Sequence, residues 1–354
     1  MRLKSIDRLQ VGDLLAKPVY DDKCQLLLAK DAILTENYIT RLRSSNIQCV
    51  YIEDEISEGI EFDNVISDEL KIRSVNTVKN VFRSLTDRKN TLYTVQDFDS
   101  IQHLIDDMLK SIYDHRNTLY CMTELMGTDM YTYHHCAEVA ILSMLVTKSL
   151  GLNQNFIHKV GVGALLHDIG KMKVDSGILN KAEALNADEL EIIRRHPRIG
   201  YDMLKDSANI SPISRQIVLL HHEKLNGVGY PLGLKAEEIP VHVRVVTMCD
   251  IFNAITSNRP YMKRINADMA LEVLRAETVY ELDREVLHHL LKVVNIYPMG
   301  TIVELTDGRL AMVIKENKEV QTRPIVQVIM GTKRTDVVDL MEHLTLFISR
   351  TIEF

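Results

Sequence analysis

Seven histidines and aspartates recur within one stretch of the chain, and two vicinal pairs among them constrain the fold most. The pairs are His167-Asp168, within HDIGK, and His221-His222, within HHEKLNGVGYP. Imidazole and carboxylate groups are the ligands that Fe, Mn, Zn and Ni sites use. Because adjacent residues on a helix face different ways, such a pair serves one metal only near a distorted helix end, or else its members bind two different metals. The remaining members of the set are His135, His196 and Asp250.

The region 126–297 contains all seven residues and has the pattern of an almost entirely helical domain. Asn186, followed three residues later by Glu189, is a capping box that predicts the start of a helix. Pro212 and Pro240 also predict helix starts, because proline is favoured in the first turn. A helix end fixes the direction of a ligand better than a loop does. We therefore expect His167-Asp168 and His221-His222 near helix ends, and His135 inside a helix.

Three further segments accompany this domain. Residues 1–60 alternate short apolar runs with turn signals and predict a small α+β domain, for which a regulatory role is one interpretation. Residues 61–125 predict a helical connector, with one long helix over IQHLIDDMLKSIYDHRNTLYCMTEL; a homodimer through this helix and packing on its own chain both remain open. Residues 298–354 contain alternating runs around Asp307-Gly308, a hairpin signal, and predict a small β-rich segment. The expected fold class is mainly α.

Composition and charge exclude several functions. The N-terminal residues MRLKSIDRLQVGD lack the apolar core of a signal peptide, and no apolar run approaches the roughly 18 residues of a membrane helix. The five cysteines are dispersed without a CxxC pair, as in a reducing cytoplasm. We therefore expect a cytoplasmic protein without a membrane partner. The net charge of −7 argues against DNA or RNA polymers as partners, so a phosphodiester substrate would need local positive charge such as bound metals.

The motifs HDIGK, HHE…GYP and CDIFNAITSNRPY, taken in this order, resemble those of the HD-GYP family of bacterial cyclic di-GMP phosphodiesterases. The resemblance covers residues 126–297, and the opening segment LKSIDRLQVGDLLAKPVYDD resembles an N-terminal domain often attached to such proteins. It implies an all-helical HD-type metallohydrolase domain that hydrolyses cyclic di-GMP to pGpG, GMP or both in bacterial second-messenger signalling.

The resemblance also implies a dinuclear metal centre. Asp168 would bridge the two divalent metals, for which we expect iron or manganese, with nickel and zinc also compatible with mixed imidazole and carboxylate ligands. Tyr131 stands where some members have a glutamate for a third metal, so we expect two. The ligands of the basic HD site would be His135, His167, Asp168 and Asp250, and those added for the second metal His196, His221 and His222.

Catalytic and substrate-binding roles follow from the same resemblance. Besides Asp168, the catalytic residue would be Lys171, stabilising phosphate charge or assisting departure of the 3′-oxygen. Tyr230 would stack on a base or donate to phosphate, and Gly229 would let the backbone approach the ligand closely. Arg259 and Lys263 would contact phosphate or guanine, with plain surface charge an equal alternative.

Two departures from the family pattern leave alternatives open. Asn226 and Asn253 stand where members commonly have aspartate; Asn253 lies three residues from Asp250 and would border the metals. Glu223 would orient a ligand histidine or be a solvated carboxylate. The alternatives to cyclic di-GMP hydrolysis are a catalytically weak receptor for a cyclic dinucleotide and a phosphodiesterase for cyclic GMP-AMP.

Overall fold

The structure is a computed structural model that describes residues 1–21, 25–45, 47, 49–60, 64–87, 95–115, 119–120, 131–179, 181, 183–257, 265–331 and 333–352. The chain divides into two compact units. A helical unit is formed by residues of Val65–Tyr120 and Tyr131–Val294. A mixed unit contains the described residues of Met1–Asn64 and Asn295–Phe354, so segments from the two ends of the sequence fold together.

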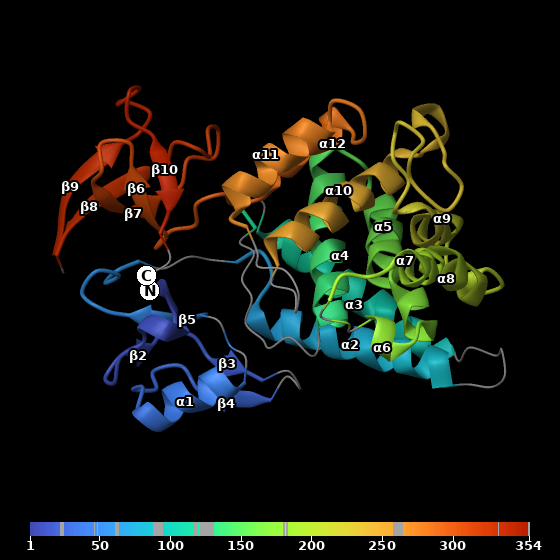
Figure 1. The fold of residues 1–354 in the computed structure, drawn as a ribbon, viewed down its shortest axis with the longest axis horizontal. Coiled ribbons are helices and arrows are strands. Elements are labelled where there is room, and N and C mark those ends of the chain that lie inside the picture. Colours follow the sequence, from blue (N-terminus) through green and yellow to red (C-terminus); the bar gives the residue numbers. More distant parts are fainter. Residues whose placement is uncertain are drawn as a thin grey trace. The chain divides into compact units, whose positions relative to one another are not determined.

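The helical unit is built around α4, Tyr131–Ser149, which packs against α5, Gln154–Leu166, and α10, Val241–Thr256 (Figure 1). Helix α4 is apolar on every side, and such a helix is stable only when neighbours cover it all round. The helices around this core are α2 (Asp68–Asp87), α3 (Val95–Asp114), α6 (Ser176–Leu179), α7 (Ala187–Arg194), α8 (His196–Leu204), α9 (Pro212–Leu220), α11 (Ala267–Glu277) and α12 (Arg284–Val293), with 3₁₀ turns at Ile169–Lys173 and Ala236–Glu238.

The capping signals of the sequence are confirmed. The side chain of Asn186 accepts a hydrogen bond from the backbone N–H of Glu189, and the Glu189 carboxylate accepts one from the Asn186 N–H in return. Pro212 begins α9 after the cap residue Ser211, and Pro240 is the cap residue of α10. These caps fix where α7, α9 and α10 begin, and α9 and α10 carry ligand residues.

The long connector helix is shorter than its pattern predicts. Helix α3 ends at Asp114, and Tyr120 instead forms a bridge to Val294, with its N–H bonded to the Val293 carbonyl at 2.8 Å. The prediction of helix is therefore wrong at residues 119–120, because pairing with the end of α12 replaces the helical hydrogen bonds there; residues 116–118 and 121–125 lie outside the described residues. The apolar face of α3, including Ile105 and Met108, is buried within the helical unit. A homodimer through this segment stays a prediction.

The mixed unit contains short strands and one helix. In the N-terminal part the strands are β1 (Arg2–Ser5), β2 (Leu14–Leu15) and β5 (Cys49–Glu53), in the order β1-β5-β2, with a separate pair β3 (Val19–Tyr20) and β4 (Leu26–Leu28) and the helix α1 (Glu36–Ser44). The C-terminal part is a five-stranded antiparallel sheet of order β10-β6-β7-β8-β9, with bounds Ile302–Leu305 for β6, Leu310–Lys315 for β7, Ile325–Met330 for β8, Lys333–Asp339 for β9 and Ile348–Thr351 for β10.

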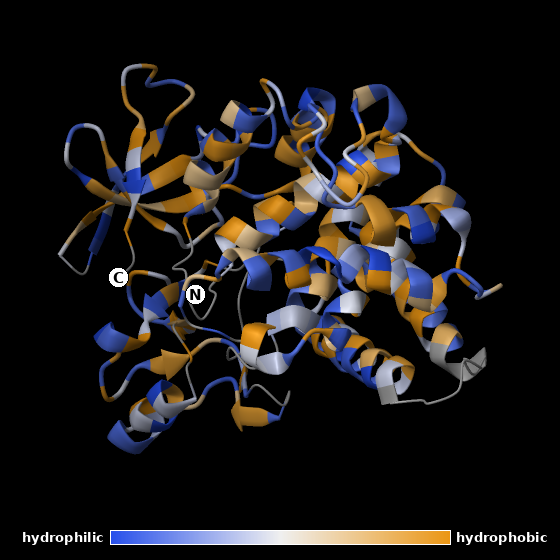
Figure 2. Ribbon diagram, turned by 45° about the vertical axis from the view of Figure 1, so that its right-hand side comes forward, coloured by the Kyte–Doolittle hydropathy of each residue, from blue (hydrophilic) through white to orange (hydrophobic). Residues whose placement is uncertain are grey.

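The predicted hairpin around Asp307-Gly308 joins β6 to β7, with Gly308 at a φ of 84° that favours glycine. The mainly α fold class with a β-rich C-terminal part is confirmed. Hydrophobic and hydrophilic stretches alternate along the helices in Figure 2, as expected where one face packs and the other meets water. Among the described helices, none combines the length and the apolar character that crossing a membrane requires.

Candidate metal centre

Four of the five ligand histidines have a hydrogen-bond acceptor beside Nδ1. His167 at the C-terminal cap of α5 bonds through Nδ1 to the Ala164 carbonyl at 2.7 Å. His196 at the start of α8 uses the Ile193 carbonyl at 2.7 Å, and His221 at the C-terminal cap of α9 uses the carbonyls of the preceding turn. The fourth, His135 inside α4, bonds through Nδ1 to Oδ1 of Asn253 at 2.6 Å. In each case Nδ1–H donates, which leaves Nε2 as the lone-pair nitrogen.

The Nε2 atoms of these four histidines converge on Asp168, which lies between α5 and the 3₁₀ turn Ile169–Lys173. Oδ1 of Asp168 lies 3.2 Å from Nε2 of His196 and 3.9 Å from Nε2 of His221. Oδ2 lies 3.5 Å from Nε2 of His167 and 3.9 Å from Nε2 of His135. The two oxygens of one carboxylate thus face two different histidine pairs.

Asp250 of α10 completes the second side of the cluster. Its Oδ1 lies 2.9 Å from Nε2 of His135 and 3.9 Å from Nε2 of His167, while Oδ2 lies 3.8 Å from Nδ1 of His222. Among the described residues, two groups without cysteine have ligand atoms that all lie within 4.8 Å of one another, and a third group of Cys136, His167 and Asp168 overlaps them. One of the two groups without cysteine consists of Asp168, His196, His221 and His222, and the other of His135, His167 and Asp250.

Close packing at Gly170 brings His196 next to Asp168. A Cβ atom on Gly170 would overlap the backbone carbonyl of His196 and lie 2.7 Å from the backbone nitrogen of Gly200. Only glycine lets the 3₁₀ turn Ile169–Lys173 lie this close to the N-terminal turn of α8. The glycine of HDIGK is thus explained by helix packing that positions two ligand residues.

Burial keeps most of the histidines neutral. It lowers the pKa of His196 and His221, and it lowers the pKa of His222 to about 3. Burial also opposes a charge on His167, but the neighbouring Asp168 carboxylate outweighs it and raises the pKa of that imidazole. Three neutral imidazoles therefore stand ready as lone-pair donors.

The carboxylates are held ionised. Burial raises the pKa of Asp168, but Lys171, whose Nζ lies 2.6 Å from Oδ2, outweighs burial and holds the pKa well below its usual range. Burial also raises the pKa of Asp250, but the neighbouring His135, whose Nε2 lies 2.9 Å from Oδ1, outweighs burial and holds this pKa well below its usual range. The Asp168 and Asp250 carboxylates in turn raise the pKa of Lys171 against its burial. Ionised carboxylates beside neutral imidazoles are the donor set that a divalent metal requires.

The loop after His222 is folded back on the metal cluster. The Tyr230 ring stacks on the His222 ring, with centroids 4.7 Å apart and planes at 28°. Glu223, buried at 2 % exposure, accepts hydrogen bonds from the backbone N–H groups of Leu232 at 2.7 Å and Leu234 at 2.9 Å. Glu223 therefore holds the loop, and the prediction that it either orients a ligand histidine or is solvated is wrong.

Close packing explains why glycine stands at position 229. A Cβ atom there would lie 2.6 Å from the carbonyl oxygen of His222 and 2.5 Å from the Cα of Glu223. The loop backbone thus passes directly over the backbone of His222 and Glu223. Asn226 lies on the exposed side of this loop, where its Oδ1 accepts from the Val228 N–H at 3.2 Å, away from the metal cluster.

Two residues contact the site in ways that the sequence did not predict. The guanidinium of Arg194, near the end of α7, lies 5.5 Å from the centroid of the Tyr230 ring. Its only sequence signal is its position two residues before His196. Tyr131, the first residue of α4, stacks on His135 at 5.7 Å and 14°. Arg259 and Lys263 lie outside the described residues.

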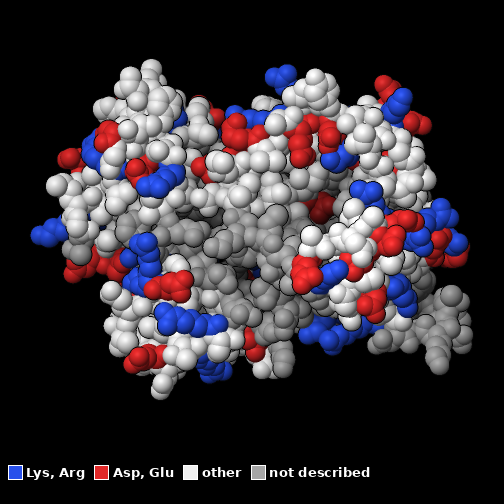
Figure 3. Space-filling view, viewed as in Figure 1, with Lys and Arg blue, Asp and Glu red and all other residues white. Residues whose placement is uncertain are grey.

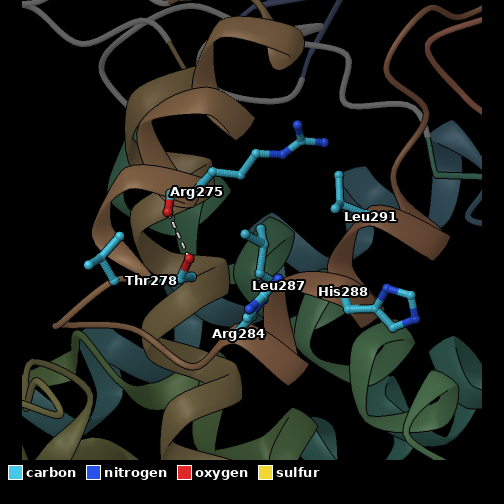
Figure 4. A pocket seen from close by; sticks show the side chains of 7 residues that line it. Arg275, Thr278, Arg284, Leu287, His288 and Leu291 are labelled. Atoms are coloured by element: carbon cyan, nitrogen blue, oxygen red, sulfur yellow. Dashed lines mark hydrogen bonds between the residues drawn. The ribbon is translucent and has the colours of Figure 1, made fainter.

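A surface groove between α11 and α12 is separate from the cluster (Figure 4). It is lined by Arg275, Thr278, Val279, Arg284, Leu287, His288 and Leu291, none of which is a ligand residue. On the face shown in Figure 3, the described Lys and Arg residues intermix with Asp and Glu.

Comparison with known proteins identifies the family of the helical unit. The HD domain family matches residues 103–286, and a KOW domain associated with the HD domain matches residues 302–354. The chain belongs to the HD domain family, and the resemblance to the HD-GYP proteins is confirmed.

Three relatives show the range of the similarity. Cyclic di-GMP phosphodiesterase PA4108 of Pseudomonas aeruginosa is 37% identical over 65% of this chain and 55% of its own length. 3'3'-cGAMP-specific phosphodiesterase 3 of Vibrio cholerae is 32% identical over 48% of this chain and 36% of its own. The solved structure of Bd1817, an HDG"Y"P protein from Bdellovibrio bacteriovorus, covers 81% of this chain and 97% of that one at 17% identity and a TM-score of 0.50, which supports the fold. The chain spans about half or less of the length of these curated relatives.

Proposed function

We propose that this chain is a metal-dependent phosphodiesterase that hydrolyses cyclic di-GMP. The observation that supports it most is the placement of Asp168, whose two oxygens face two separate groups of histidines. A carboxylate placed in this way suits a bridge between two cations. The names of the Pseudomonas aeruginosa and Vibrio cholerae relatives support a cyclic dinucleotide as the substrate class.

The residues present fit two divalent metals. Nε2 of His167 and Oδ1 of Asp168 are buried without a hydrogen-bond partner within the described part of the chain. Nε2 of His196 lies 3.2 Å from Nε2 of His221, although both nitrogens carry lone pairs because both Nδ1 atoms donate elsewhere. Buried acceptors that face one another are stable only around a shared proton or cation.

The proposed ligand sets follow the two groups. When bound, two divalent metals supply Lewis acidity that activates water and neutralises phosphodiester charge. Iron and manganese are the metals we propose first, with nickel and zinc also suited to these ligands. One metal would be held by His135, His167, Asp168 and Asp250, and the other by Asp168, His196, His221 and His222.

Lys171 supplies the cation of the site. Its Nζ lies 2.6 Å from Oδ2 of Asp168, and its side chain is 23 % exposed whereas that of Asp168 is buried. Because its pKa is raised, Lys171 is protonated at neutral pH. We assign its N–H to a phosphate oxygen or to the departing 3′-oxygen, which takes up the proton.

Tyr230 and Arg194 form the substrate-facing wall in this proposal. Burial raises the pKa of Tyr230, so its hydroxyl stays protonated and donates a hydrogen bond. One face of the ring covers His222, and the guanidinium of Arg194 lies near the ring. This arrangement suits a purine that stacks beside the tyrosine and a phosphate that pairs with the arginine. Gly229, Arg259 and Lys263 stay as proposed substrate contacts.

A product assay tests the function. Protein purified without oxygen is loaded separately with Fe(II) or Mn(II), incubated with cyclic di-GMP, and followed by chromatography over time. We expect pGpG, GMP or both, with none formed by the Asp168→Ala protein. A metal-loaded protein that binds the dinucleotide without product would favour the receptor alternative instead.

Cyclic GMP-AMP is the second candidate substrate, favoured by the similarity to the Vibrio cholerae enzyme named for it. The two dinucleotides differ in one purine, and contact with an aromatic ring such as that of Tyr230 does not by itself distinguish adenine from guanine. Competition in one reaction gives the ratio of the two kcat/KM values. A ratio above about tenfold, equal to roughly 1.4 kcal/mol of transition-state binding, identifies the preferred substrate.

A further inference from the structure

We propose that Asn253 is a positioning residue that fixes the proton of His135 on Nδ1 and thereby leaves Nε2 free to bind a metal. The inference rests on the metal binding proposed above and adds a residue to it. It assigns to an uncharged amide, at 1 % exposure, control over a ligand histidine whose Nδ1 bonds to a side chain and not to a backbone carbonyl.

The contrast with three other ligand histidines carries the argument. His167, His196 and His221 each donate Nδ1–H to a backbone carbonyl three or four residues earlier. Their orientation is therefore built into the helix ends. His135 lies inside α4, and its Nδ1 bonds to a side chain of another helix, Asn253 of α10.

The amide could present either of two faces to the ring. Its oxygen faces Nδ1 of His135 at 2.6 Å, so Nδ1 must carry the proton and Nε2 keeps its lone pair. With the amide turned over, its N–H group would face Nδ1 of His135. Nδ1 would then have to accept, the ring proton would lie on Nε2, and Nε2 could no longer bind a metal. Nδ2 of Asn253 has no hydrogen-bond partner among the described residues, so the bond to His135 is what orients the amide.

Because of helix geometry, the side chains of Asn253 and Asp250 both contact the imidazole ring of His135. They lie three residues apart on α10 and thus on one face. Asp250 Oδ1 lies 2.9 Å from Nε2 of His135, while Asn253 bonds the opposite nitrogen. Tyr131 covers one face of the ring by stacking at 14°. The ring is therefore held at Nδ1 and on one face, and its Nε2 faces the Asp250 carboxylate as two ligands of one cation would.

A neutral amide and a carboxylate differ in what they do to the ligand. Removing the acceptor in Asn253→Ala should weaken binding of a divalent metal by about 10- to 100-fold, the usual cost of losing such a partner. Asn253→Asp keeps the shape and offers a charged acceptor. Because a carboxylate makes the imidazole more basic, this variant should bind the metal at least as tightly as the wild-type chain.

Two measurements test the proposal on the full chain. Long-range ¹H–¹⁵N NMR of the metal-free protein identifies the protonated nitrogen of His135, assigned with a His135→Gln variant. Equilibrium dialysis with Mn(II) and with Co(II) gives the metal affinity of the wild-type, Asn253→Ala and Asn253→Asp proteins, and the Co(II) absorption spectrum reports the ligand geometry. We expect a proton on Nδ1 in the wild type, weaker binding in Asn253→Ala, and recovery in Asn253→Asp.

The outcomes separate this inference from the proposed function. A wild-type His135 with its proton on Nε2 overturns the inference, and this result needs no variant to fold and no metal to bind. Unchanged affinity and spectrum in Asn253→Ala overturn it as well. The wild-type protein could also have a protonated Nδ1 and yet bind neither Mn(II) nor Co(II). This result would contradict the proposed metal centre, while the role of Asn253 in fixing the proton of His135 would still hold.

Discussion

Nζ of Lys171 lies 2.6 Å from Oδ2 of Asp168, so the cation of HDIGK contacts the carboxylate that both histidine groups share. The contact lies on the Oδ2 side, which faces His135 and His167, while Oδ1 faces His196 and His221. Lysine offers no lone pair while protonated. Its role at this position is therefore electrostatic and acid–base, and it can be removed without removing a ligand.

The variant Lys171→Met should separate catalysis from metal binding. We expect turnover of cyclic di-GMP to fall by about 10²–10⁴-fold, the usual contribution of a positioned acid. Metal content, measured by plasma mass spectrometry, should stay the same because all seven ligand residues remain. Lys173→Met is the matched control, since Lys173 is exposed in the same 3₁₀ turn and bonds the Thr86 carbonyl. Loss of metal in Lys171→Met would show that the lysine supports the ligands instead.

Asp168→Asn should remove metal and activity together. The amide keeps the size of the side chain but loses the charge and one oxygen, so neither histidine group keeps its shared ligand. We expect metal content to fall to one ion or fewer and turnover to fall by more than about a hundredfold, beyond the loss typical of an outer-shell partner. Asp202→Asn, on the exposed side of α8, is the control. Full activity of Asp168→Asn would contradict the two-metal proposal.

Two substitutions at Tyr230 should distinguish the ring from its hydroxyl. Tyr230→Phe keeps the stack on His222, whereas Tyr230→Ala removes it. If the ring binds a purine, KM for cyclic di-GMP should rise by about 2- to 10-fold in Tyr230→Ala, in line with the 0.5–1.5 kcal/mol of an aromatic pair. Steady-state kinetics at fixed metal content check this. Equal KM values for both variants would assign the effect to the hydroxyl.

Much of the site could be predicted from local sequence, because its parts are helix ends. HDIGK and HHE combine ligand residues with a glycine or a cap, and the structure does place His167 and His221 at the C-terminal caps of α5 and α9. The contacts that bring these helix ends together depend on long-range packing. The partnership of His135 with Asn253 spans 118 residues, and no local pattern encodes it.

The misinterpretations have the same cause. Glu223 follows a ligand pair in sequence, yet its carboxylate points to the backbone of Leu232 and Leu234, which fold back over it. Residues 115–120 continue the apolar spacing of α3, yet Tyr120 pairs with Val294. In both cases a tertiary hydrogen bond decides the local structure, and the pattern of the segment alone does not contain its partner.

Gly170→Ala should damage the site through packing alone. The added methyl group would meet the His196 carbonyl and the Gly200 backbone, which are main-chain atoms and cannot turn aside. We expect a loss of unfolding free energy of about 1–3 kcal/mol or more and a fall in metal content, because α8 must move away from Asp168. Chemical denaturation and metal analysis measure the two effects.

Gly177→Ala is the matched control for this substitution. Its added methyl group would meet only Oδ1 of Asp175, a side chain that can rotate. This protein should therefore keep its metal and most of its stability. Gly170→Ala with unchanged metal content would show that the contact with α8 does not position His196.

Acid should destabilise the contact between the two helices that carry His221 and Asp250. His242 of α10 donates through Nε2 to Oε1 of Gln216 on α9 at 2.9 Å, and burial lowers its pKa from 6.5 to about 4. Between these two values the unfolded chain binds a proton that the folded chain does not. The contribution of neutral His242 to the unfolding free energy is therefore complete above pH 6.5 and is lost as the pH falls toward 4. Denaturation of the metal-free protein at pH 7.5, 6 and 5 should show a loss about 1–2 kcal/mol smaller in His242→Gln than in the wild type. Parallel pH profiles of the two proteins would show that His242 titrates alike in the folded and unfolded chains, and that the contact between α9 and α10 withstands acid.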